Sequence, residues 1–164
     1  MTNKIQITEA NKYNTTDIAK WIRQTFKAVY PDIKFSVRTS LYAGGSSIAV
    51  TILENNRTRI LKTFDEVTPQ EICSVMSGRG DNEEEAKAFI KQQINSEYHQ
   101  VNQFHIDSSW HWTEEGKKLL TEIMGIIDKY NHDNSDSMTD YFDVNYYVDF
   151  NLGDYDKPYV EVAK

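Results

Sequence analysis

Hydrophobic positions near the start of the chain repeat first with the period of a helix and then with the period of a strand. Over residues 15–30 apolar side chains recur three and four positions apart, and Pro31 follows, which predicts a helix that ends there. Apolar and polar residues then alternate over 33–39 and over 47–53, which predicts two strands. Because glycine tolerates positive φ, the glycine-bearing residues 40–46 are expected to form the loop of a β-hairpin.

Capping signals mark three further helices in the middle of the chain. Thr68 precedes a proline and stands three positions before a glutamate, Asn82 also stands three positions before a glutamate, and Thr113 precedes a long apolar stripe. These signals predict helices over about 68–78, 82–98 and 113–130. The preceding segment 57–66 fits both a helix and a strand, with a slight preference for the helix.

The clearest alternation in the chain lies in its C-terminal part. Residues 141–150 alternate polar and apolar throughout, and a turn at Gly153 separates them from a short returning strand over 158–162. Since strands and helices fall in separate runs, the predicted fold class is α+β, with a mostly antiparallel sheet, helices packed on one face and a helical insertion in the middle. At this length the chain is expected to form a single domain over 1–164.

Composition narrows the class of protein. Hydrophobic residues make up 39% of the chain and charged residues 26%, which is enough for a buried core. The single cysteine, Cys73, excludes an internal disulfide, and within its predicted helix we interpret it as a small apolar filler rather than a nucleophile. Since no apolar run approaches the length of a membrane span, we expect a cytoplasmic protein without a membrane partner.

The net charge of −7 hides a segregation of charge along the chain. Residues 1–66 hold ten Lys and Arg against six Asp and Glu, a net charge of +4, whereas residues 128–164 hold three against nine, a net charge of −6. The overall acidity argues against a general binder of phosphate backbones. The segregation has two interpretations: the two ends neutralise each other within one sheet, or the acidic end faces a basic partner.

The C-terminal part is rich in aspartates interleaved with tyrosines. On the predicted strand Asp143, Tyr147 and Asp149 share the polar side, so their side chains project about 7 Å apart for every two residues, a spacing similar to that of phosphates. Tyrosines are favoured anchors at protein interfaces. We therefore expect a partner-binding surface that mimics DNA toward a basic channel, with a merely solvated face as the alternative. Its residues are Asp136, Asp140, Asp143, Tyr147, Asp149, Asp154, Tyr155 and Asp156.

Two blocks of sequence resemble one known family. FSVR at 35–38 and YAGGSS at 42–47 follow a predicted helix, and DSMTD at 136–140 precedes a tyrosine-rich hairpin. This pattern resembles the large polyvalent protein-associated domain family, the twenty-ninth of its numbered series. The resemblance implies a family core over about 15–66 and 134–163 with a helical insertion over about 67–131. It also implies an origin in phages or conjugative plasmids, whose accessory proteins counter host defences, and it carries over no catalytic residue.

The glycine-bearing hairpin loop of this family motif is a second candidate site. Its residues are Ser36, Arg38, Tyr42, Gly44, Gly45 and Ser46. Backbone N–H groups at the glycines suit an anion or a binding partner. The alternative is structural: the glycines shape the hairpin, and Arg38 pairs with an acid across the sheet. Neither GxGxxG nor GxxxxGK[ST] occurs, so no nucleotide site is expected.

Three histidines, His99, His105 and His111, stand six residues apart and form a weak candidate for a zinc site. Zinc takes neutral imidazoles completed by a carboxylate or a thiolate, which Asp107 or Cys73 would supply. A spacing of six places no two of them on one helix face, and HxxxH, HExxH and HxH are absent. Ordinary loop histidines are the alternative, and no other cofactor is expected.

Together these features predict a binding protein without enzymatic activity, an accessory protein of a phage, a plasmid or a related mobile element. It is expected to act stoichiometrically on a host defence protein, a nuclease or CRISPR effector, as an anti-CRISPR or anti-restriction protein does. Direct nucleic-acid binding is not expected. Two alternatives stay open: a metal-binding protein of unknown activity, and a nucleic-acid-associated module that uses the basic residues Lys34, Arg38, Arg57 and Arg59.

Overall fold

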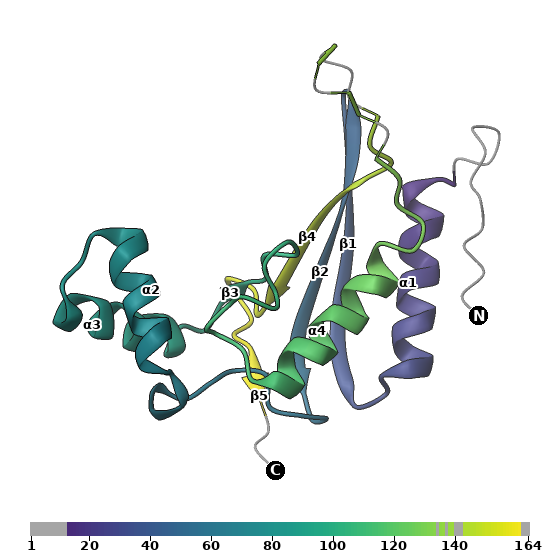
Figure 1. Cartoon of the computed structure of the whole chain (residues 1–164). Coiled ribbons are helices and arrows are strands. Elements are labelled where there is room, and N and C mark those ends of the chain that lie inside the picture. Colours follow the sequence, from purple (N-terminus) through teal and green to yellow (C-terminus); the bar gives the residue numbers. More distant parts are fainter. Residues whose placement is uncertain (1–12, 134, 137, 140–142, 162–164) are drawn as a thin grey trace.

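The computed structural model describes residues 13–133, 135–136, 138–139 and 143–161. In chain order the elements are α1 (Thr15–Val29), β1 (Ile33–Tyr42), β2 (Gly45–Asn55), the short 3-10 helix η2 (Phe64–Glu66), α2 (Pro69–Arg79), α3 (Glu83–Ile94), β3 (His99–Gln100), α4 (Glu114–Ile127), β4 (Tyr147–Leu152) and β5 (Val160–Glu161). The strands form one sheet, with α1 and α4 against it and α2 and α3 to one side (Figure 1).

β2 is the central strand of the sheet. It pairs antiparallel with β1 on one side and parallel with β4 and β5 on the other, while β3 pairs antiparallel with β4. The predicted α+β class is therefore confirmed, but the sheet is mixed rather than mostly antiparallel. Parallel neighbours need a crossover connection, and the chain between β2 and β4 includes α4, which lies against the sheet (Figure 1).

The expected C-terminal hairpin requires the strand after Gly153 to pair with β4. In the structure this strand, β5, pairs with β2 instead. The chain leaves the sheet at Gly153, whose φ of 77° favours glycine, and makes a turn closed by two hydrogen bonds between the backbones of Asp154 and Lys157. It then rejoins β2, so that β5 lies further along the edge of β2 that β4 occupies. Residues 153–159 therefore form a loop between two strands, β4 and β5, that pair along the same edge of β2.

The two helices with the strongest apolar stripes, α1 and α4, pack on one face of the sheet, as the pattern predicts (Figure 1). Their apolar residues recur three and four positions apart, so that one side of each helix faces the sheet. The centre of this core is formed by Ile18, Ile22 and Phe26 of α1, Ile48, Val50 and Ile52 of β2, and Leu120, Ile123 and Ile127 of α4. Burial of each such side chain stabilises the fold by about 1.5–3 kcal/mol, which makes this face the main source of stability.

α2 and α3 form a smaller unit beside the sheet (Figure 1). Both begin with the predicted capping boxes, at Thr68 and at Asn82, and α3 ends at Ile94, earlier than expected. The unit has its own core, made of Val67, Val75, Ala86 and Ile90. The predicted division into a family core and an insertion stays a prediction; α4, which falls in the predicted insertion, packs in the main core.

Residues 57–66 are mostly extended, so the slight preference for a helix is wrong. Within them η2 is the only helical turn, and Leu61 forms an isolated bridge with Trp112. The backbone N–H of Ile60 donates to the carboxylate of Glu161, and its carbonyl accepts from the N–H of Thr113 at 2.8 Å. Because distant residues engage both backbone groups of Ile60, a helical turn cannot use them.

Two strand boundaries also differ from the pattern. The hairpin strands extend to Tyr42 and Gly45, so a tight turn replaces the expected loop over 40–46. β4 begins at Tyr147, and the described residues before it lie outside the strand. Asn145 donates from Nδ2 to the carbonyl of Tyr130 at 2.9 Å, and the Tyr146 hydroxyl donates to the carbonyl of Ile127 at 2.5 Å. These bonds hold the stretch before β4 against the end of α4 and away from the sheet.

The first turn of α4 packs directly on the backbone of the 57–66 segment. Its N-cap residue, Thr113, donates its hydroxyl to the carbonyl of Arg59 at 2.6 Å and accepts from the N–H of Gly116 at 3.0 Å. A Cβ on Gly116 would lie 2.8 Å from both the Cα and the carbonyl oxygen of Ile60. Glycine is therefore required there for the helix to approach the backbone.

We expect Gly116→Ala to lower the free energy of unfolding by about 1–3 kcal/mol, because the helix and the Ile60 backbone must separate. Gly78→Ala is the matched control, since Gly78 lies near the end of α2 with nothing within 4 Å of where a Cβ would stand. That variant should be unchanged or more stable by up to about 1 kcal/mol. Urea unfolding measures both, and equal losses in the two variants would refute the close approach.

Candidate functional site

The side of the sheet away from α1 and α4 carries polar side chains in register. Arg38 of β1 pairs with Ala49 of β2, and Ala49 pairs with Asp149 of β4, so the three lie in one row across the sheet. The alternate row Val37, Val50 and Phe150 is buried under the helices, which places the polar rows on the opposite side. We call this surface the open sheet face. Its rows are Ser36, Thr51 and Asn151; Arg38, Ala49 and Asp149; and Ser40, Ser47 and Tyr147.

One ion pair joins the two candidate sites of the sequence on this face. Arg38 donates from Nη2 to the Oδ2 of Asp154 at 2.7 Å. Asp149 accepts from the side-chain amide of Asn151 at 3.0 Å. An exposed pair of this kind contributes little to stability, about 0–1 kcal/mol, but it holds the turn after β4 over the edge of the open sheet face.

Tyr98 completes the acidic end of the open sheet face. Its hydroxyl donates to the Oδ1 of Asn151 at 2.7 Å. Burial raises its pKa, and the negative charges of Asp149 and Asp154 raise it further. Tyr98 therefore stays a neutral hydrogen-bond donor beside two carboxylates. The sequence pattern missed it, because its partner lies 53 positions away and no local signal marks it.

The predicted acidic surface is only partly brought together. Tyr147, Asp149 and Asp154 gather at the open sheet face, and the exposed Tyr155 and Asp156 follow in the adjoining turn. Both tyrosines of this group are exposed to solvent: the exposed fraction is 49% for Tyr147 and 96% for Tyr155. We call these five residues the acidic rim of the open sheet face.

The expected row of Asp143, Tyr147 and Asp149 does not form. Because β4 begins after it, Asp143 lies outside the strand, with its Oδ1 3.5 Å from the Nε2 of His132. Asp136 is exposed in the segment before β4, where its Oδ1 accepts from the N–H of Met138. Asp140 lies outside the described residues.

Ion pairs inside the molecule explain little of the charge segregation. Among the described residues, Arg38–Asp154 is the only ion pair that joins the basic first third of the chain to the acidic C-terminal part. The other arginines of the basic hairpin pair locally, Arg57 with Asp32 and Arg59 with Glu66. Three of the four basic residues proposed for nucleic-acid binding are therefore engaged by carboxylates.

A family model described as Large polyvalent protein associated domain 29 matches residues 13–117, more than half of the chain. The chain belongs to this family. No curated protein and no solved structure matches it. Large polyvalent protein associated domains are associated with phages and mobile elements in general, so the predicted link to such elements is confirmed at that level.

The match to Large polyvalent protein associated domain 29 covers α1, the β1–β2 hairpin and the α2–α3 unit, and it ends within α4. It therefore contains the β1 and β2 residues of the open sheet face, while the β4 residues of that face lie beyond it. None of the helices in the described residues combines the length and the apolar character needed to cross a membrane.

The family motif divides into a turn and a buried anchor. Gly44 has a φ of 93°, which favours glycine in the tight turn, and Tyr42 pairs directly with Gly45 across it. Ser46 is buried, with its Oγ 2.7 Å from the Oγ1 of Thr15 and donating to the carbonyl of Asn145 at 3.2 Å. The structural alternative for this loop is therefore confirmed in its two parts, the hairpin and the Arg38 ion pair. Anion binding there stays a prediction.

The structure brings two of the three candidate zinc ligands together. The ring centroids of His99 and His111 are 6.5 Å apart, whereas His105 is exposed on the neighbouring loop. Burial lowers the pKa of both rings, that of His111 to about 4 with further repulsion from His99, and the Nε2 of His99 is buried without a hydrogen-bond partner. Within the described ranges no three His, Cys, Asp or Glu side chains converge as a metal site requires. Zinc binding stays a prediction.

Cys73 is exposed on α2. Its interpretation as an apolar filler is wrong, because the apolar stripe of this short helix turns Val75 inward and leaves Cys73 on the solvent side.

We expect Ser46→Ala to lower the free energy of unfolding by about 1–3 kcal/mol, because it leaves the buried hydroxyl of Thr15 and the carbonyl of Asn145 without this partner. Ser40→Ala is the matched control, since Ser40 is exposed on the neighbouring strand and should change stability by less than about 0.5 kcal/mol. Thermal unfolding of the two variants measures the difference, and a Ser46 variant as stable as the control would contradict the anchor.

Stability should depend on pH through the buried histidine pair. The unfolded chain binds a proton at His111 near the ordinary pKa of 6.5, but the folded chain does so only near 4. The unfolded state therefore holds more protons between these values, and the free energy of unfolding falls as the pH is lowered from about 6.5 to about 4. His111→Phe should flatten this fall, whereas His105→Phe should keep it. Urea unfolding at several pH values checks both, and an unaltered slope in the first variant would exclude the pair as its source.

Proposed function

We propose that this chain is a counter-defence accessory protein of a mobile element, of the anti-CRISPR or anti-restriction type. It acts by stoichiometric binding to a host defence protein, a nuclease or a CRISPR effector, and not by catalysis. The membership of a family associated with phages and mobile elements supports the setting. The open sheet face and its acidic rim are the proposed contact surface.

The observation that carries this proposal is the pair of carboxylates around Tyr98. Asp149 and Asp154 lie on the side of the sheet away from α1 and α4, beside Tyr98, and Asp149 is exposed. Tyr98 is 44% exposed beside them, so the surface combines negative charge with aromatic side chains that need not be uncovered on binding. Tyrosine is enriched among the residues that dominate interface energies. The carboxylate of Asp149, with the exposed Asp156 in the adjoining turn, attracts a basic channel over a distance.

A basic channel that accepts nucleic acid fits this surface better than nucleic acid itself. Arg38 is neutralised by Asp154, which leaves the centre of the open sheet face without an unpaired arginine. The remaining charge near Tyr98 is the carboxylate of Asp149, which repels phosphates. The surface therefore supports binding to a protein that binds nucleic acid, with the aspartates in the place of phosphates.

DNA cleavage by a purified host nuclease or CRISPR effector, titrated with the chain, tests the proposal. We expect inhibition that is complete near a one-to-one ratio, and at least about a tenfold loss of potency for Asp149→Lys and for Tyr98→Ala. The association rate should fall with added salt for the wild type and depend less on salt for Asp149→Lys.

Glu84→Lys on the distant α3 is the matched control, because it makes the same change of net charge on an exposed residue outside the open sheet face. It should inhibit as the wild type does. Inhibition by substoichiometric amounts would indicate catalysis, and an equal loss in Glu84→Lys and Asp149→Lys would reduce the effect to net charge; either result would end the proposal. A gel-shift of DNA by the chain alone would favour the nucleic-acid alternative instead.

A further inference from the structure

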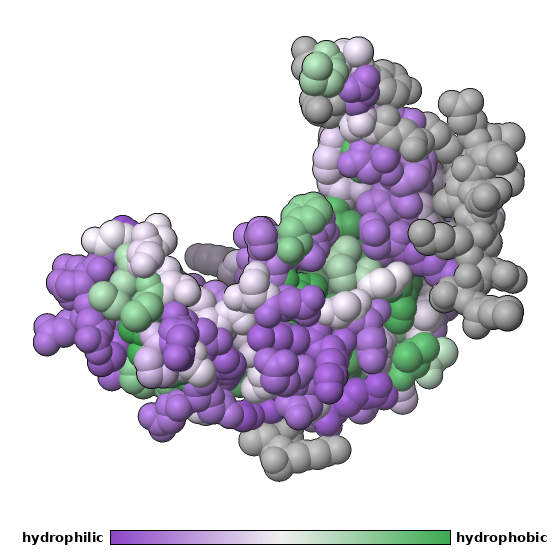
Figure 2. Space-filling view, in the orientation of Figure 1, coloured by the Kyte–Doolittle hydropathy of each residue, from purple (hydrophilic) through white to green (hydrophobic). Residues whose placement is uncertain are grey.

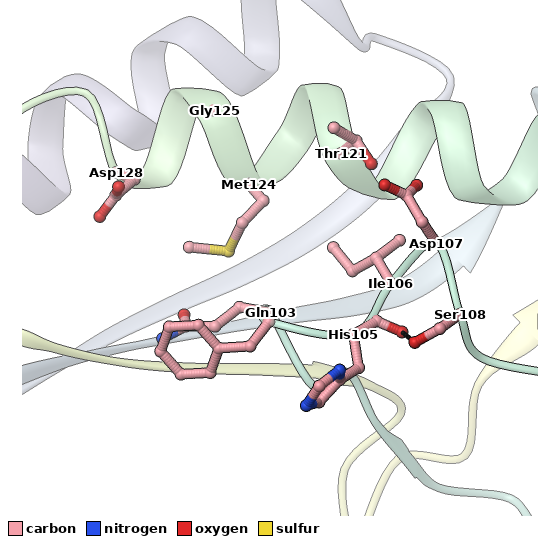
Figure 3. A pocket seen from close by; sticks show the side chains of 10 residues that line it. Gln103, His105, Ile106, Asp107, Ser108, Thr121, Met124, Gly125 and Asp128 are labelled. Carbon is pink, nitrogen blue, oxygen red and sulfur yellow. Dashed lines mark hydrogen bonds between the residues drawn. The ribbon is translucent and has the colours of Figure 1, made fainter.

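A groove runs along α4 on the other side of the molecule from the open sheet face. One side of the groove is the stripe Thr121, Met124, Gly125 and Asp128, spaced as i, i+3, i+4 and i+7, and the other is the segment 103–108. Its volume is about 350 Å³. Figure 3 shows Met124 pointing from the helix toward the facing segment, with Asp128 and Asp107 near opposite ends.

The groove continues past the end of α4 into a larger hollow of about 590 Å³. The two share Phe104, Met124 and Asp128, so they form one channel along the helix. Val144 and Val148 extend the apolar lining. The α4 stripe alone covers about 10 Å at 1.5 Å per residue, which matches about two turns of an added helix.

One large aromatic side chain on the rim of the groove is exposed to solvent. The side chain of Phe104 is 81% exposed, although it stands between the two hollows. Figure 2 shows hydrophobic surface gathered in the middle of this face, where α4 and the 101–112 segment lie in Figure 1. The exposed ring of Phe104 adds to the apolar side chains of Ile106 and Met124 in a groove that polar residues otherwise line. Apolar surface rimmed by polar residues is typical of an interaction site.

Gly125 leaves open space on the side of α4 that lines the groove. Glycine inside a helix destabilises it by about 1 kcal/mol relative to alanine. Nothing lies within 4 Å of where a Cβ of Gly125 would stand, so packing within the described chain does not require glycine there. At Gly116 of the same helix the close approach of Ile60 gives such a reason. The open space at Gly125 lets a backbone from outside approach α4 within the groove, whereas Gly78, which has the same open space, lines neither hollow.

The charge of the groove selects the partner. Among its described lining residues the carboxylates are Asp107 and Asp128, with Asp133 in the continuation, and lysine and arginine are absent from both hollows. A second copy of this chain would set carboxylates against carboxylates across the interface. A segment that carries lysines or arginines beside its apolar residues would complement them.

We infer that this groove is a docking site for an amphipathic helix of a partner protein, with an apolar stripe flanked by basic residues. The stripe lies on Met124 and Phe104, the helix backbone passes close over Gly125, and the basic side chains reach Asp107 and Asp128 at the two ends. This is the helix-in-groove mode of recognition, in which residues at i, i+3, i+4 and i+7 supply the anchors. The inference does not rest on the proposed function, because Tyr147, which lines the second hollow, is the one residue named for both surfaces, and neither argument rests on it.

Fluorescence anisotropy with a labelled synthetic helix tests the site. The probe is a peptide of about 18 residues with leucines at i, i+3, i+4 and i+7 and lysines elsewhere, and its counterpart carries glutamates in place of the lysines. We expect the lysine peptide to bind the wild type at least about tenfold more tightly than the glutamate peptide. Gly125→Leu, which fills the groove, and Phe104→Ser, which removes the exposed ring, should each weaken binding at least about tenfold.

Gly78→Leu is the matched control, since it adds the same side chain to another helical glycine with open space around it. It should bind the lysine peptide as the wild type does. The melting temperatures of Gly125→Leu and Phe104→Ser should not be lower than that of Gly78→Leu. Three outcomes would overturn the inference. The first is that the glutamate peptide binds as tightly as the lysine peptide. The second is that binding is unaffected by Gly125→Leu but lost in Asp149→Lys. The third is that the chain forms a concentration-dependent dimer, which Phe104→Ser dissociates. The second places the peptide on the open sheet face, and the third makes a second copy the occupant. Failure of the nuclease assay leaves these results unaffected.

Discussion

The parallel pairing of β4 with β2 is the contact on which the rest of the structure depends. It gives the central strand its second neighbour, with Ser47 to Ile52 against Tyr147 to Leu152 in unbroken register. The same register sets Phe150 and Leu152 into the core beneath the helices and turns Asp149 to the opposite side. One line of backbone hydrogen bonds therefore both completes the core and assembles the open sheet face, because alternate residues of a strand point to opposite faces.

Local signals in the sequence predicted most of the helices and the first hairpin. The caps at Thr68, Asn82 and Thr113 each begin a helix, since a cap acts within a few residues of itself. Direction of pairing is a different matter. Alternation identifies residues that suit a strand, but it does not show which strand will pair with which. The mixed sheet and the pairing of β5 with β2 could therefore not be predicted from the sequence. The 57–66 segment was misjudged for the same reason, because Glu161 and Thr113 decide its backbone from far along the chain.

The candidate surface was predictable in its parts and not in its assembly. Arg38 and Asp154 were both singled out from the sequence, in separate sites, and the structure joins them in one ion pair. Asp143 fell out of the expected row because hydrogen bonds to the end of α4 delay the start of β4. Tyr98 carries no local signal, and only the fold brings it to Asn151. The contacts that assemble the candidate surface join residues 53 and 116 positions apart, which composition and spacing do not resolve.

The order of synthesis adds a consequence of the central strand. β2 leaves the ribosome about 90 residues before β4, its partner on one edge. At about 5–20 residues per second that edge stays unpaired for several seconds while the intervening helices are made. During this interval the hydrogen-bonding groups along that edge of β2 lack the strand that pairs with them in the finished sheet, and an unpaired edge can pair with a neighbouring nascent chain. Mispairing at β2 is therefore most favoured before the C-terminal strand is made.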